Sequence, residues 1–109
     1  MRTVARKPDR QPSFADRIIA ADERFMRFLL EHEDEASLLP TGAVVIFRDD
    51  DDPALFQEAG SLALTIHAKI RSSKERSRPP VIVDVTTPSI SLKPTSWEGL
   101  AEDVGNARS

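Results

Sequence analysis

Five aspartates lie where the two clearest strand-like stretches end, and carboxylates are the side chains that a hard cation prefers. Residues 49–52 are all aspartate and follow the apolar run 43–47, while Asp84 lies near the end of the run 81–85. If these strands are parallel, they end at the same edge of the sheet, where α/β folds usually bind ligands. A divalent metal such as Mg²⁺, with water completing its shell, would suit this edge, and a metal-dependent enzyme is one alternative function. The candidate ligands are Asp49, Asp51 and Asp84.

The same aspartates also have a plain structural explanation, because aspartate is common in turns and at helix N-termini. Other catalytic chemistry is poorly represented. The chain has no cysteine or tyrosine and only two histidines. No glycine-rich loop joins strand to helix, and four aspartates there would repel a phosphate. We therefore predict no catalytic residues, no cofactor and a non-enzymatic protein.

A basic cluster offers a second chemistry, which is nucleic-acid binding. It consists of Lys69, Arg71, Lys74, Arg76 and Arg78, interrupted by one acid, Glu75. A basic arm at residues 1–12 would add to it in a nucleic-acid-binding or toxin-partner module. The cluster has no aromatic residue to stack on bases, and cations also favour a helix C-terminus, so solubility and helix stabilisation explain it as well.

These side chains must be positioned by helices and strands that the spacing predicts. Ser13 and Asp16 form a capping-box pattern before a long amphipathic helix. That helix is expected to break in the acidic segment 31–35. The runs 43–47 and 81–85 are rich in β-branched residues, as in strands buried on both faces. A helix over 53–73, capped by Asp52 and with proline at its first position, connects them. Its inward side is expected to consist of Leu55, Ala59, Leu62, Ala63, Ile66 and Ile70, while Gly60 and Leu64 on the opposite side could admit a close neighbour. The predicted fold is therefore a small α/β domain with a parallel β–α–β unit.

Two strands do not make a stable sheet, so a third must come from residues near Ile90 to Leu92 or from a second subunit. A short amphipathic helix, capped at Thr95 and ended by Gly105, follows. The predicted organisation is a flexible basic arm over 1–12, an α/β domain over 13–87 and an extended C-terminal segment over 88–109.

Apolar side chains in excess of what one small sheet needs favour an interaction protein. Met26 and Leu30 widen the apolar face of the first helix, and Trp97, Leu100 and Val104 share one face of the last. We predict a small accessory subunit or homo-oligomer that docks on a protein partner through these five residues. The alternative is that these surfaces pack against each other within one monomer.

Length and composition agree with a small globular protein. The chain has 109 residues, enough for one domain, and a net charge of −3, which gives no general attraction to nucleic acid or membrane. No apolar run spans a bilayer and no signal peptide is apparent, so a cytoplasmic location is expected.

Three segments resemble a family of small uncharacterised prokaryotic proteins, known only as a domain of unknown function. They are Phe28 to His32 (FLLEH), Leu39 to Phe47 (LPTGAVVIF) and Asp51 to Leu55 (DDPAL). A looser similarity extends over residues 16–85, and the basic arm and the Trp97 segment lie outside it. The resemblance implies the order helix, strand, helix, strand, and it carries over no functional residue.

Overall fold

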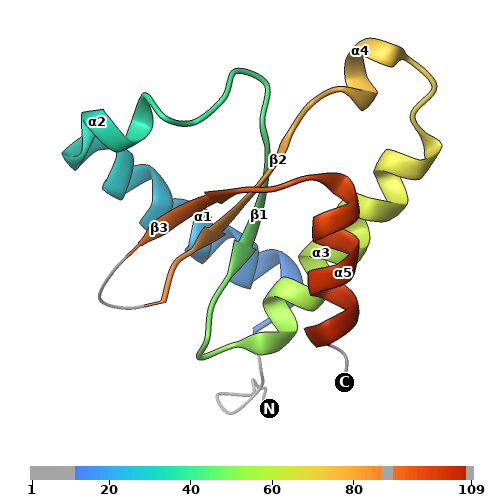
Figure 1. Ribbon diagram of the computed structural model, residues 1–109. Coiled ribbons are helices and arrows are strands. Elements are labelled where there is room, and N and C mark those ends of the chain that lie inside the picture. The colour runs from blue at the N-terminus through green and yellow to red at the C-terminus, as the bar shows by residue number, and fades with distance from the viewer. Residues whose placement is uncertain (1–11, 87–89, 108–109) are drawn as a thin grey trace, which may run out of the picture.

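The computed structural model describes residues 12–86 and 90–107, which form a three-stranded sheet with helices on both faces (Figure 1). The small α/β fold predicted from the sequence is confirmed. In chain order the elements are α1 (Phe14–Glu31), α2 (Glu33–Ala36), β1 (Val44–Arg48), α3 (Pro53–Lys69), α4 (Ser73–Arg76), β2 (Pro80–Asp84), β3 (Ser91–Pro94) and α5 (Trp97–Ala107).

The sheet has the order β1-β2-β3 and is mixed. β1 and β2 are parallel, with Ile46 beside Ile82, and α3 is the crossover between them, as the β–α–β prediction required. β3 pairs with β2 in the antiparallel direction, with Leu92 beside Val83. The third strand therefore comes from the same chain, which was the first of the two expected sources.

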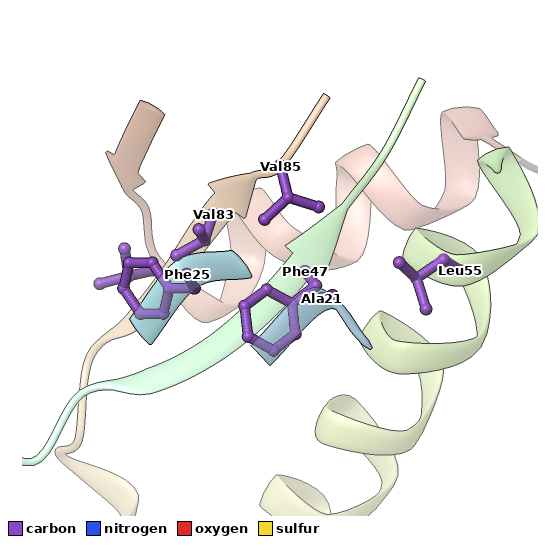
Figure 2. Close-up of a cluster of buried hydrophobic side chains, with 7 residues drawn as sticks. Ala21, Phe25, Phe47, Leu55, Val83 and Val85 are labelled. Carbon is purple, nitrogen blue, oxygen red and sulfur yellow. The ribbon is translucent and has the colours of Figure 1, made fainter. Parts of the chain in front are cut away.

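Alternation along the strands divides the core between the two faces of the sheet. On one face, Phe47 and Val83 pack with Ala21 and Phe25 of α1 (Figure 2). The Phe25 and Phe47 rings meet edge to face, with their centroids 5.9 Å apart. On the other face, Ile46 of β1 and Ile82 of β2 pack against Phe56 of α3 and against Leu100 and Val104 of α5.

The ends of α1 follow from local chemistry. The Ser13 hydroxyl accepts a hydrogen bond from the Asp16 amide, so the predicted cap is present. The helix ends at Glu31, and a separate turn, α2, begins at Glu33. Carboxylates are unfavourable at a helix C-terminus, which accounts for the break that the acidic segment predicted.

The prediction for α3 is correct at its start, wrong at its end and wrong for two residues of its inward side. The helix begins at Pro53 but stops at Lys69, and α4 is a separate turn. Leu62 and Ile66, expected to face inward, are half exposed. The opposite side, where Gly60 was expected to admit a close neighbour, packs against Val104 of α5. The physical reason is that α5 packs against α3 and thereby selects which of its apolar sides is buried.

The C-terminal segment belongs to the domain. Ser96, not Thr95, caps α5, because its hydroxyl accepts from the Gly99 amide. The helix continues through Gly105 to Ala107. Since β3 and α5 both contribute to the sheet and the core, the described residues after Ile90 are not a free extension. The predicted arm at 1–12 lies, apart from Pro12, outside the described residues.

Candidate functional site

Asp49, at the end of β1, is the one charged side chain that is buried among the described residues. Its Oδ1 accepts a hydrogen bond of 2.9 Å from the Asp51 amide. Its Oδ2 accepts one of 3.1 Å from the Arg24 guanidinium of α1. Both oxygens are therefore used to shape the turn after β1 and to attach α1 to it.

Asp52 was expected to cap α3, but its side chain makes no cap hydrogen bond. It instead accepts two hydrogen bonds, of 3.0 and 2.9 Å, from Nη1 of Arg17. Nη2 of the same guanidinium pairs with Glu58. The hydrogen bonds to Asp52 and then to Glu58 raise the pKa of Arg17 above that of a free guanidinium. This arginine joins α1 to the first turns of α3.

Asp84 is also occupied by its own turn, because its Oδ1 accepts from the Thr86 amide at 2.9 Å. The Thr86 hydroxyl in turn accepts from the Asp50 amide at 2.9 Å, linking the ends of β1 and β2. Across the described residues, no three acidic or histidine side chains are grouped to hold a metal. The structure therefore does not group the predicted ligands Asp49, Asp51 and Asp84 as a metal site. Local turns and Arg24 use the carboxylates of Asp49 and Asp84, whereas Asp51 contributes its backbone amide.

A cavity of about 410 Å³ does open at the carboxyl end of β1. The Arg48 guanidinium lies over the Phe56 ring, 5.7 Å from its centroid, on one side of this cavity. Asp103 and Asn106 of α5 also line this cavity, and sequence reasoning missed both because it did not place α5. The lining mixes one cation, three carboxylates and one amide, a set that selects no particular ligand charge.

The basic cluster is only partly available to a ligand. Nη1 of Arg76 donates to the carbonyls of His67 and Ile70, at 3.2 and 3.0 Å, and so satisfies the end of α3. Arg78 pairs with Glu75 at 3.3 Å. The remaining members, Lys69, Arg71 and Lys74, are exposed. Two of the five candidate nucleic-acid contacts thus have structural roles.

Three of the five predicted partner-binding residues pack within their own chain. Leu100 and Val104 are fully or almost fully buried against α3 and the sheet. The Trp97 ring stacks on His67, with centroids 4.0 Å apart, and its Nε1 donates to the Arg78 carbonyl at 3.0 Å. We therefore correct the expectation for Leu100 and Val104, whose side chains are not accessible to a partner, and Trp97 is partly covered.

The other two predicted residues lie at the surface. Met26 is 50% exposed and Leu30 80% exposed. Ile19, which is also exposed, lies seven residues before Met26. At this spacing all three side chains project from one side of α1, away from the side buried against the sheet. α1 therefore carries two apolar sides, and the sequence indicated the second by its excess of apolar residues.

A further apolar surface lies beside the outer edge of β1. A groove of about 250 Å³ runs there between α1 and α3. Its lining includes Phe14, Ile18, Val45, Leu62 and Ile66. Sequence reasoning missed the groove, because it took Leu62 and Ile66 to face the core.

No described helix combines the length and apolar character needed to cross a membrane.

Comparison with known proteins gives a family and nothing more specific. Neither a curated protein nor a solved structure matches the chain. One family model matches residues 13–76, from the cap of α1 to the end of α4, and leaves out the basic arm and Trp97. This match covers more than half of the chain, and the chain therefore belongs to DUF5647, a family of unknown function.

Proposed function

We propose that this protein is a non-enzymatic interaction protein, an accessory subunit that docks on a protein partner through the outer side of α1. The observation that carries the proposal is the exposed row of Ile19, Met26 and Leu30. A helix whose inner side already packs on a sheet has no structural need for a second apolar side. Such rows are typical of helices that bind in a partner's groove.

The surroundings of the row suit an interface. Glu23 and Arg27 are exposed beside it, so an apolar centre is bordered by charges of both signs. Burying one fully exposed leucine contributes roughly 1.5–3 kcal/mol, so three partly exposed side chains give only a few kcal/mol. A stable complex needs about 800 Å² on each partner, and the charged border must therefore take part.

The proposal is tested by isolating the tagged full-length chain from its native cells and identifying what is bound in stoichiometric amount. We expect one protein partner that is retained by the wild type and lost from the double variant Met26→Lys/Leu30→Lys. The control, Ser91→Lys/Ala101→Lys, adds the same charge at exposed positions on β3 and α5 and should retain the partner.

Two results would contradict the proposal in different ways. If the α1 variant retains the same partner, docking occurs through another surface. If the wild type carries no stoichiometric protein, and only nuclease-sensitive material bound through Lys69, Arg71 and Lys74, then the nucleic-acid alternative replaces the interaction function.

A further inference from the structure

The exposed side of α3 has an acid at one end, a base at the other and apolar residues between them. Glu58, Leu62, Ile66 and Lys69 are spaced by four, four and three residues, so they lie on one side of the helix. Leu62 is 51% exposed and Ile66 52% exposed, and both charged residues are exposed as well. We call these four residues the α3 row.

The α3 row borders the outer edge of β1. The Val44 amide donates to the Pro79 carbonyl, and the Arg48 carbonyl accepts from the Val85 amide. Alternate residues of a strand bond to the same neighbour, so the backbone of Val45, between them, is directed to the other edge. Within the described residues no strand pairs with that edge. α5 packs against the Gly60 side of α3, and although its Trp97 lines the same groove as Leu62 and Ile66, both of these side chains stay half exposed.

We propose that a second copy of this chain covers the α3 row, with the two α3 helices antiparallel across a twofold axis. Read from the N-terminus, the row begins with an acid, continues with two apolar residues and ends with a base. Read from the C-terminus, it begins with the base and ends with the acid, so two rows that run in opposite directions place each charge opposite its countercharge. An antiparallel pair thus places Glu58 opposite Lys69 of the other copy and Leu62 opposite its Ile66. A parallel pair would instead place like charges together, which is unfavourable.

The two ends of α3 extend the same complementarity. Asp50 and Asp51 are exposed just before the helix, and Arg71 and Lys74 are exposed just after it. In the antiparallel pair, each acidic end approaches the basic end of the other copy. This arrangement gives the exposed members of the basic cluster a role that needs no nucleic acid.

Glu58 is held in place for this contact. The Arg17 guanidinium binds it together with Asp52, so the carboxylate is oriented before any partner arrives, and the three side chains keep a net negative charge. The proposed contact uses α3 and the β1 edge, whereas the proposed function uses the outer side of α1. The two proposals therefore stand or fall separately.

Sedimentation equilibrium of the full chain over a range of concentrations tests the dimer. We expect twice the chain mass at high concentration. Lys69→Glu should weaken the dimer roughly tenfold, because two exposed ion pairs become two repulsions. The matched control Lys93→Glu makes the same charge change on β3 and should leave the dimer unchanged.

A further variant removes the apolar centre. Leu62→Ser/Ile66→Ser should abolish the dimer while the far-ultraviolet circular dichroism is retained, because both side chains are half exposed in one copy. A wild type that stays monomeric at every concentration would overturn the inference. So would a dimer that Lys69→Glu and Lys93→Glu weaken equally, or that survives Leu62→Ser/Ile66→Ser. Because none of these changes lies in the exposed row of Ile19, Met26 and Leu30, they leave the proposed partner-docking surface intact.

Discussion

Gly60 of α3 lies so close to Val104 of α5 that a β-carbon at position 60 would overlap the valine side chain. The two helices are in direct backbone-to-side-chain contact there. This contact places α5 over Ile46 and Ile82 and completes the second half of the core.

Gly60→Ala is therefore expected to destabilise the fold by about 1–3 kcal/mol, the usual range for overpacking a close contact. Urea unfolding followed by circular dichroism measures it. Gly105→Ala is the control, because nothing lies within 4 Å of a β-carbon there, and alanine in a helix should stabilise by up to about 1 kcal/mol. The double variant Gly60→Ala/Val104→Ala should lose less free energy of unfolding than the two single variants lose in sum. If the losses are additive, the two residues are not in contact.

The local elements could be predicted because their signals are local. Ser13 and Asp16 mark a helix start wherever the helix packs, and alternation along β1 requires only a sheet with two covered faces. Rotation of α3 could not be predicted in this way. Its sequence has apolar residues on more than one side, and only the docking of α5, some forty residues later, decides which side is buried.

The candidate site was predicted from residue types, and types alone do not show which carboxylates are already engaged. Asp49 and Asp52 bind arginines of α1, and those arginines lie more than twenty residues earlier in the chain. No spacing in the sequence connects them. In contrast, the second apolar side of α1 could be predicted from the sequence. An amphipathic helix needs only one apolar side, and α1 contains more apolar residues than one side holds.

Trp97 fixes the start of α5 in two ways, by stacking on His67 and by donating to the Arg78 carbonyl. Trp97→Phe keeps a ring for stacking but loses the donor, so we expect a loss of about 1 kcal/mol. Trp97→Ala loses both and should cost about 2 kcal/mol, since the ring is only partly buried. Equal losses for both variants, measured by circular dichroism in urea, would show that stacking contributes nothing.

Arg17 joins α1 to α3 through two carboxylates, and its removal leaves Asp52 and Glu58 near each other without a countercharge. We expect Arg17→Ala to lower the melting temperature clearly more than Arg27→Ala, a control on an exposed part of the same helix. Arg17→Lys should recover only part of the loss, because one ammonium group does not reproduce the guanidinium fork.

The pH dependence of this contact follows from the raised pKa of Arg17. A raised pKa means that the folded state holds the proton more tightly, so the stabilisation is complete below the ordinary arginine value and is lost as the pH rises from that value through the raised one. As far as the arginine proton is concerned, the difference in the free energy of unfolding between the wild type and Arg17→Ala should therefore be constant from neutral pH up to about pH 10. Urea unfolding at a series of pH values measures it. If this difference falls steadily over the alkaline range, the raised pKa of Arg17 is contradicted.

Mg²⁺ is expected to leave the protein's stability unchanged, because the carboxylates of Asp49 and Asp84, at the carboxyl edge of the sheet, already have protein partners. A ligand that binds only the folded state at a hundred times its Kd stabilises by about 2.7 kcal/mol, which a thermal melt detects easily. We therefore expect the same melting temperature in millimolar Mg²⁺ and in EDTA at matched ionic strength. Asp49→Asn, which weakens the pairing with Arg24 inside the fold, should lower the melting temperature equally in both solutions. A rise with Mg²⁺ that Asp49→Asn or Asp84→Asn abolishes would restore the metal hypothesis, because it would mean that the cation displaces Arg24 or the Thr86 amide from these oxygens.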